Sequence, residues 1–207
     1  MFGVQKPGIS SPSNPYTAAT EKIVADLAFV LDLPVPPVTL WDRGAAAGAP
    51  RYVAVSAWAF EQPFTWLQIE ALLSREQLQQ MVRPASAMLP FEEWIGADDR
   101  QNAGNVLVGF GPANEAIGAW IDYAFALDHV WRGNERANCA VRELYPRVGI
   151  PDTDAMKSTA ERIAGVDSKT IEEIINRVPS QYLPAGVAEN IRRNLLLRQS
   201  AVHRLWT

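Results

Sequence analysis

Residues 94–108, WIGADDRQNAGNVLV, and residues 119–124, AWIDYA, are the two stretches that decide the fold. Together they hold three aspartates and three amide side chains: Asp98, Asp99, Asp122, Gln101, Asn102 and Asn105. Apolar sequence of the kind found in β-strands lies between the two polar clusters. Carboxylates and amides so placed can orient a hydroxyl and hold metal ions, and phosphoryl transfer from a metal-bound nucleotide requires both tasks.

The apolar sequence between the clusters predicts a β-hairpin. Residues 106–110 and 117–121 are short strand candidates, and Gly111 and Pro112 form a turn between them. Asn105 enters the first strand and Asp122 follows the second, so we expect both to lie at the open end of the hairpin. A carboxylate and a carboxamide are oxygen ligands suited to Mg²⁺.

The polar loop before the hairpin supplies the remaining candidates. Asp99 is placed to accept a hydrogen bond from a hydroxyl, and Arg100 to neutralise a phosphate or to hold the loop. Two alternatives stay open, because Asp98 is adjacent to Asp99 and Asn102 could replace Asn105 as the metal ligand. An Asp-Arg pair before a strand is also compatible with a simple turn that carries a surface ion pair.

Composition places the chain among ordinary soluble globular proteins. The 207 residues are 48% hydrophobic and 20% charged, with a formal net charge of −4. That balance argues against a general nucleic-acid or membrane-surface binder, since either needs a basic face. The sequence shows no signal peptide and no apolar window long enough for a transmembrane helix. A single cysteine, Cys139, favours a reducing cytoplasmic location.

The pattern of elements changes near residues 59–64. Before this point we expect an α/β unit with a strand at 2–5, a helix that begins at Asn14 and Pro15, and strands at 38–41 and 51–58. The helix should pack through one apolar face, made of Ile23, Leu27, Val30 and Leu31.

After residue 64 helices should dominate. A capping box at residues 74–77 should begin a helix that stops near Pro84, and residues 85–96 should form a further helical segment that Pro90 interrupts. The remaining helices are expected at residues 134–145, 154–166, 169–177 and 185–206.

Several segments resemble the HipA-like kinases and the phosphatidylinositol kinases. Residues 99–108 resemble their Asp-Arg-His-x-x-Asn catalytic loop, and residues 119–127 are similar to their Ile-Asp metal-binding segment. Residues 4–7 resemble the strand with the nucleotide-binding lysine, residues 20–28 the helix with its glutamate partner, and residues 31–37 the Leu-Gly-Leu-Pro-Val-Pro ending of that helix.

The resemblance implies an α+β, two-lobed protein-kinase-like fold. One domain would span residues 1–207, with a reduced N-terminal α/β lobe at 1–60 and a mainly helical C-terminal lobe at 61–207. It also implies an ATP- and Mg²⁺-dependent phosphotransferase whose acceptor is a Ser or Thr hydroxyl, most naturally on a protein. A regulatory protein partner is compatible with that group.

Roles follow from the same resemblance, position by position. Lys6 would contact the α- and β-phosphates and Glu21 would hold Lys6 through an ion pair. Asp99, next to Arg100, would orient the acceptor hydroxyl. Asn105 and Asp122 would bind Mg²⁺, and the backbone near Ala57 and Trp58 would contact the adenine.

The sequence departs from the family pattern in three places. Asn105 lies six residues after Asp99 instead of five, and Gln101 stands where the family has histidine. The Gly/Ser/Pro stretch at residues 8–13 follows Lys6, so it is not the Gly-rich phosphate loop in the usual order. An alternative reading is therefore a non-catalytic, kinase-like binding module. A weaker one is a metal-dependent hydrolase that uses Asp98, Asp99 and Asp122.

Overall fold

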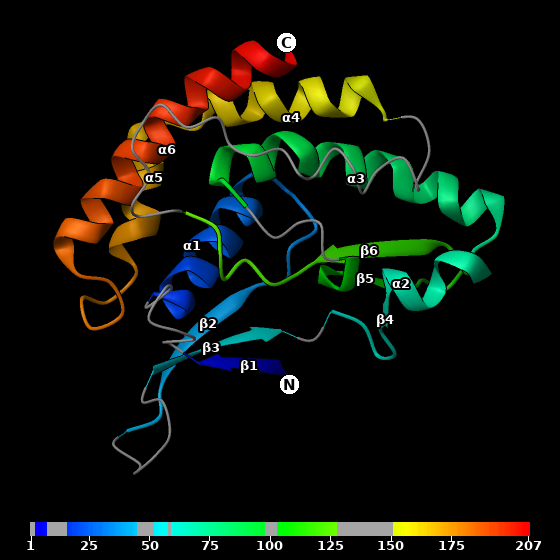
Figure 1. Cartoon of the computed structure of the whole chain (residues 1–207), viewed down its shortest axis with the longest axis horizontal. Helices are drawn as coiled ribbons and strands as arrows, with labels where there is room; N and C mark the ends of the chain where they lie inside the picture. Colours follow the sequence, from blue (N-terminus) through cyan, green and yellow to red (C-terminus); the bar gives the residue numbers. More distant parts are fainter. Residues whose placement is uncertain (1–2, 8–15, 45–51, 58, 98–102, 128–150) are drawn as a thin grey trace.

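The computed structural model describes residues 3–7, 16–44, 52–57, 59–97, 103–127 and 151–207. Within this part of the chain, six strands form two separate antiparallel sheets of three strands each, and helices cover them (Figure 1). The expected mixture of helices and short strands is therefore confirmed.

The first sheet contains β1 (Gly3–Pro7), β2 (Val38–Asp42) and β3 (Tyr52–Ala57), in the order β1-β3-β2. Helix α1 (Thr17–Val30) packs on this sheet and is buried along most of its length. Figure 1 shows α1 between the sheet and the C-terminal helices. The strands predicted from the sequence are all found, with ends shifted by one or two residues.

Helix α1 begins later than predicted, and one residue of its predicted apolar face is exposed. It begins at Thr17, and Asn14 and Pro15 lie outside the described residues. Ile23 and Leu27 are buried as expected, but Val30 is 47% exposed. Leu31, which directly follows the helix, is buried as expected, with 2% of its surface exposed.

The end of α1 is a Schellman-type turn built around an aspartate. The N–H of Asp32 donates to the carbonyl of Phe29, and the N–H of Leu33 donates to the carbonyl of Ala28 at 2.9 Å. Asp32 has a positive φ of 50° in this turn. Glycine is the usual residue at such a position, because a side chain is strained there.

The second sheet contains β4 (Phe64–Thr65), β5 (Val106–Phe110) and β6 (Ala116–Trp120), in the order β4-β5-β6. Strands β5 and β6 are the predicted hairpin, with Val106 opposite Trp120 at the open end. The two-residue strand β4 was not predicted, because so short a segment carries no periodic signal.

Helix α3 (Arg75–Ile95) corrects the prediction that a helix stops near Pro84. The capping box is present, since Ser74 accepts from the N–H of Gln77 at 3.2 Å, but the helix continues through Pro84 and Pro90. A proline inside a helix costs roughly 3 kcal/mol. Burial of large apolar side chains along α3 offsets that cost: Met81, Met88, Leu89, Phe91, Trp94 and Ile95.

Three helices complete the described chain: α4 (Thr153–Gly165), α5 (Ser168–Asn176) and α6 (Ala185–Trp206). All three match the predicted helices to within one residue, and the predicted helix at 134–145 lies outside the described residues. Smaller elements are the short helix α2 (Trp66–Ile69) and the 3₁₀ turns η1 (Glu70–Leu72) and η2 (Ala103–Asn105).

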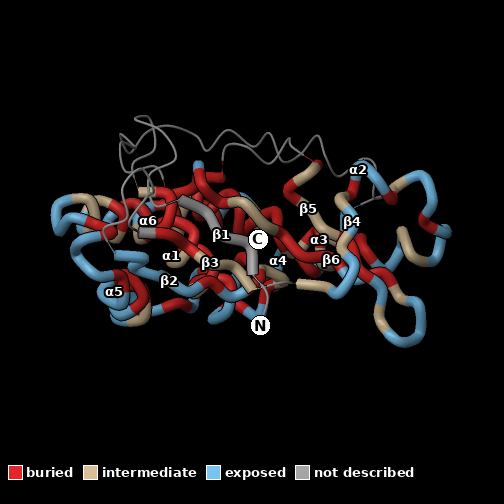
Figure 2. The backbone as a smooth tube through the Cα atoms, turned by 90° about the horizontal axis from the view of Figure 1, so that it is seen from below, coloured by how far each residue is buried: buried red, intermediate tan, exposed pale blue. Residues whose placement is uncertain are grey.

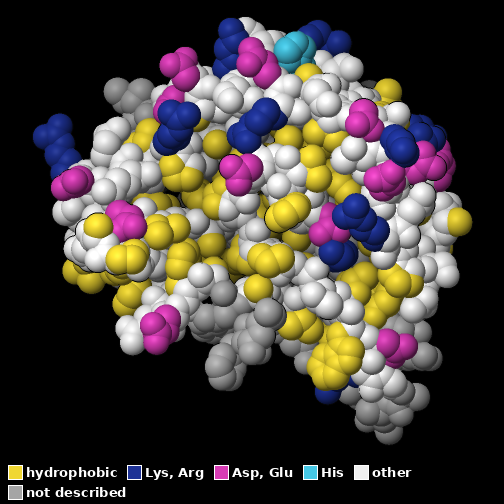
Figure 3. All heavy atoms as spheres, turned by 180° about the vertical axis from the view of Figure 1, so that it is seen from behind, with side chains coloured by type: hydrophobic (Ala, Val, Ile, Leu, Met, Phe, Trp, Pro, Cys, Tyr) yellow, Lys and Arg dark blue, Asp and Glu magenta, His cyan; other side chains and the backbone are white. Residues whose placement is uncertain are grey.

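The apolar core is continuous through the molecule. Buried residues run through α1, the two sheets and the inner faces of α3, α4 and α6. Most exposed segments lie at the left and right sides of the molecule in Figure 2. On the face seen in Figure 3, acidic and basic side chains are interspersed around apolar ones. No helix in the described segments is long and apolar enough to cross a membrane.

Candidate functional site

The open end of the β5–β6 hairpin brings the backbones of residues 105 and 121 together. The N–H of Ile121 donates to the carbonyl of Asn105 at 2.9 Å, so Asp122 follows directly after a bond to the Asn105 backbone. Asn105 ends the turn η2 and is buried, whereas Asp122 is half-buried. The two ends of the hairpin are thus adjacent through their backbones, as the predicted hairpin requires.

The backbone of Asp122 has a left-handed conformation. Its φ is 65°, in a region that is uncommon for residues other than glycine, although aspartate and asparagine tolerate it better than most. Such conformations persist where the surroundings hold them, and they are often found at functional sites. The turn separates Asp122 from the regular path of β6.

Glu21, on the helix α1 that packs on the first sheet, binds the segment that contains Asp122. Its side chain comes from α1 and is 5% exposed, and it accepts a hydrogen bond of 3.0 Å from the N–H of Tyr123. A carboxylate buried to this extent is costly unless it accepts hydrogen bonds. The bond therefore ties α1 to the residue next to Asp122, although 102 positions separate the two in sequence.

A second bond holds the other side of Asp122. The N–H of Trp120 donates to the carbonyl of Pro34 at 2.9 Å, and Pro34 lies in the segment that follows α1. Asp122 therefore lies between two points, at Trp120 and Tyr123, that are both fixed by α1 and its continuation.

The remaining predicted residues are placed only in part. Lys6 lies on β1 with its backbone opposite Ala54, but its side chain is outside the described part of the structure, as are Asp98, Asp99, Arg100, Asn102 and Trp58. Ala57 ends β3, and its N–H donates to the carbonyl of Pro37 at 2.9 Å. That N–H is thus already used within the protein, and the carbonyl of Ala57 accepts a hydrogen bond of 3.4 Å from Oγ of Ser56.

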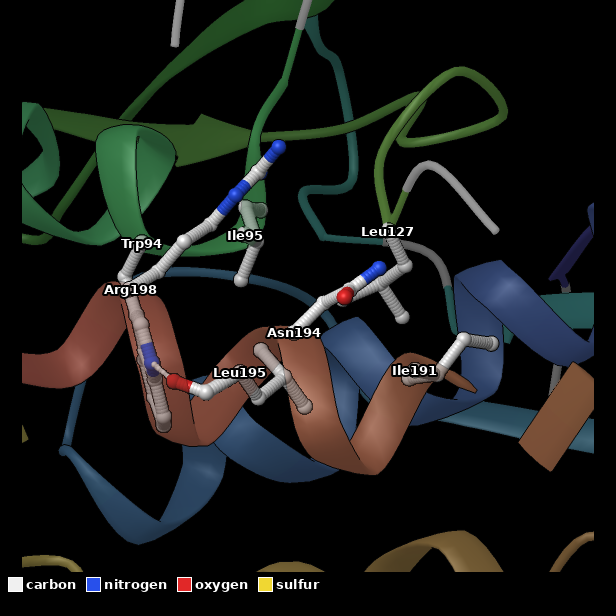
Figure 4. A pocket seen from close by; sticks show the side chains of 7 residues that line it. All are labelled: Trp94, Ile95, Leu127, Ile191, Asn194, Leu195 and Arg198. Carbon is white, nitrogen blue, oxygen red and sulfur yellow. Dashed lines mark hydrogen bonds between the residues drawn. The ribbon is translucent and has the colours of Figure 1, made fainter. Parts of the chain in front are cut away.

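The chain enters residues 98–102 over a tightly packed turn. Gly96 ends α3 with a φ of 62°, and a Cβ added there would lie 2.6 Å from Cζ of Arg198 on α6. Figure 4 shows the side chains of Asn194 and Arg198 extending from α6 toward Leu127 and Ile95. Helix α6 therefore supports the chain both before residues 98–102 and after Asp122.

The small pocket at this place is no ligand site. It is lined by Trp94, Ile95, Leu127, Ile191, Asn194, Leu195 and Arg198. Its volume of about 10 Å³ has room for about one water molecule. Ligand pockets have volumes of several hundred cubic ångströms.

The described residues can be compared with the ligand sets that metal ions need. No group of three or more His, Cys, Asp or Glu side chains that could hold a metal is found among them. Mg²⁺ needs no such group, because one or two carboxylates plus substrate phosphates and water usually complete its coordination. Asn105 and Asp122, on the two sides of the hairpin end, carry an amide oxygen and a carboxylate, which are ligand types that Mg²⁺ accepts.

Comparison with known proteins supports the fold. No family model and no curated protein sequence matches the chain. Among solved structures, the chain is similar to the crystal structure of a proinflammatory kinase of Helicobacter pylori, CtkA, with a TM-score of 0.63 and 16% sequence identity. The similarity covers 97% of this chain and 89% of that one. The chain therefore has a kinase-like fold with small sheets and many helices.

Sequence reasoning missed two parts of this site. The N–H of Tyr123 and the carbonyl of Pro34 are backbone groups, and the hydrogen-bond partner of a backbone group cannot be predicted from the residue type. The stretch at residues 31–37 was singled out by its resemblance, but nothing in it indicated a bond to β6.

Proposed function

We propose that the chain is an ATP- and Mg²⁺-dependent phosphotransferase of the HipA-like kind, with two lobes and a Ser or Thr hydroxyl of a protein as acceptor. The observation that carries this proposal is the position of Asp122. It follows the strand beside Asn105 and lies next to the residue whose N–H is bonded to the buried Glu21. The kinase-like fold supports the same reading.

The geometry suits the tasks that phosphoryl transfer sets. The protein needs to place charge and to orient groups rather than to form covalent bonds. The amide oxygen of Asn105 and the carboxylate of Asp122 would hold Mg²⁺, which neutralises charge on the phosphates when it is bound. Glu21 is fixed beside them by its bond to Tyr123 and would orient Lys6. Asp99 would accept the proton of the acceptor hydroxyl, with Arg100 next to it.

The test is transfer of the γ-phosphate by the purified protein, to itself or to proteins in a lysate, together with calorimetric binding of ATP with Mg²⁺. Asp122→Asn should lower the transfer rate roughly 100-fold, the order of loss when one electrostatic group of an active site is removed. Asparagine also tolerates the left-handed backbone, so the fold should be kept.

Asp32→Asn is the matched control, because Asp32 is another aspartate with positive φ and lies in the turn after α1. This variant should retain the wild-type rate. Absence of both ATP binding and transfer in the wild type would overturn the proposal. Binding without transfer would favour the non-catalytic binding module instead.

A further inference from the structure

Residues 31–37, here called the linking segment, join three parts of the molecule through their carbonyl groups. The carbonyl of Leu31 accepts from the guanidinium of Arg162 on α4. The carbonyl of Pro34 accepts from Trp120 on β6, and that of Pro37 from Ala57 at the end of β3. One short segment thus contacts α4, the hairpin with Asp122 and the end of the first sheet.

Hydrogen bonds hold the chain on both sides of Asp122. Helix α1 carries Glu21, which is bonded to Tyr123, and the linking segment that continues α1 is bonded to Trp120. A shift of α1 would therefore move both of the points that hold Asp122. The Schellman-type turn at Asp32 makes the helix and the linking segment one stiff unit.

Arg162 is the side chain that attaches this unit to α4. Its second guanidinium nitrogen donates to Oγ1 of Thr159 at 3.2 Å, one turn earlier on α4, so the arginine is oriented by its own helix. Leu31, whose carbonyl it binds, is 2% exposed. A hydrogen bond from a charged donor is stronger than one between neutral groups.

We infer that Arg162 is a positioning residue, which acts through the linking segment to hold Asp122 in place for Mg²⁺. The part of the inference that concerns Mg²⁺ rests on the proposed function. The part that concerns the coupling between α4 and the hairpin does not. Arg162 itself lies outside the site and contacts no reacting group. Helix α4 thereby contributes to the site at the end of the β5–β6 hairpin.

The experiment compares Arg162→Met with Arg162→Lys and with Arg192→Met. Methionine keeps most of the apolar stem but has no donor, and lysine keeps one charged donor. Arg192 is the control, because its guanidinium pairs with Glu189 on the same helix, α6. All variants are studied well below their unfolding temperatures.

Amide hydrogen exchange of Trp120 and Tyr123 is the first measurement, and it requires no catalytic activity. Loss of one hydrogen bond should speed exchange at both amides about fivefold in Arg162→Met. Arg162→Lys should restore part of the protection, and Arg192→Met should match the wild type. Unchanged exchange at the two amides, or an equal increase throughout the chain, would overturn the inference.

The Mg²⁺ concentration that gives the half-maximal transfer rate is the second measurement. Arg162→Met should raise it about fivefold, whereas a loss of stability alone would leave it unchanged. An unaltered Mg²⁺ requirement in an active enzyme would contradict the role of Arg162. If the wild type transfers no phosphate, the proposed function fails, and the exchange measurement still decides whether α4 is coupled to the hairpin.

Discussion

Replacement of Gly96 by alanine should strongly destabilise the protein, because two independent effects oppose a side chain there. Gly96 has a φ of 62° at the end of α3, and its Cα faces the guanidinium of Arg198. A Cβ would lie 2.6 Å from Cζ and 2.9 Å from Nη2 of that side chain, so the arginine would have to move. Arg198 is 8% exposed, so its guanidinium would have to leave a buried position.

The expected loss of stability is the sum of the backbone strain and the steric cost. A left-handed backbone costs an alanine about 1–2 kcal/mol. Displacement of a buried guanidinium from its contacts costs about another 1–3 kcal/mol. We expect a loss of about 3 kcal/mol in the free energy of unfolding, which for a chain of this length lowers Tm by roughly 6–12 °C.

Urea unfolding of Gly96→Ala and Gly186→Ala measures this difference. Gly186 lies in the first turn of α6, and a Cβ there has no heavy atom within 4 Å. Alanine favours a helix over glycine, so Gly186→Ala should leave stability unchanged or raise it by up to about 1 kcal/mol. The same chemical change should therefore destabilise the protein at position 96 but not at position 186.

A double-mutant cycle separates steric from backbone strain. In an Arg198→Ala background the steric cost disappears, so Gly96→Ala should cost only about 1–2 kcal/mol more than Arg198→Ala alone. Full additivity would show that the two residues do not interact. A loss below about 1 kcal/mol for Gly96→Ala by itself would refute the described packing at the end of α3.

Two further predictions concern aspartates at helix ends. Asp32→Gly should stabilise the protein by about 1 kcal/mol, because glycine adopts a positive φ without strain and removes an acid from the end of α1, where the helix dipole disfavours it; a lower urea midpoint than wild type would contradict this. Asp167 accepts hydrogen bonds from the N–H and hydroxyl of Thr170, which lower the pKa of its carboxyl. Because the folded pKa lies below the unfolded one, the stabilisation is present above about pH 4 and is lost as the pH falls through the folded pKa. Asp167→Asn should therefore lose less stability than the wild type between about pH 5 and about pH 2, and equal losses in urea unfolding would refute the assignment.

Many of the helices and strands could be predicted from the pattern of apolar and polar residues in short stretches of sequence. The helices α4, α5 and α6 have clear apolar periodicity and were located to within one residue. The β5–β6 hairpin was visible as two apolar runs around a Gly-Pro turn. The capping box at Ser74 also fixed the start of α3, since its hydrogen bonds are local.

The errors arose where distant packing outweighs local preference. Pro84 predicted an end to the first helix and Pro90 an interruption of the next helical segment, yet α3 continues through both. The strand β4 has two residues and exists only because β5 offers it a partner. Neither outcome can be read from a window of neighbouring residues.

For the candidate site, the sequence by itself determined which residues carry suitable chemistry and that Asn105 and Asp122 belong to the two ends of one hairpin, which lie side by side. Only the tertiary structure decided what holds Asp122. Glu21 lies on the helix of the other sheet and Pro34 in the segment after that helix, and they bind the backbone N–H groups of Tyr123 and Trp120. Backbone donors and acceptors are the same at every non-proline residue, so their long-range partners follow from the packing of the elements and not from the residue types.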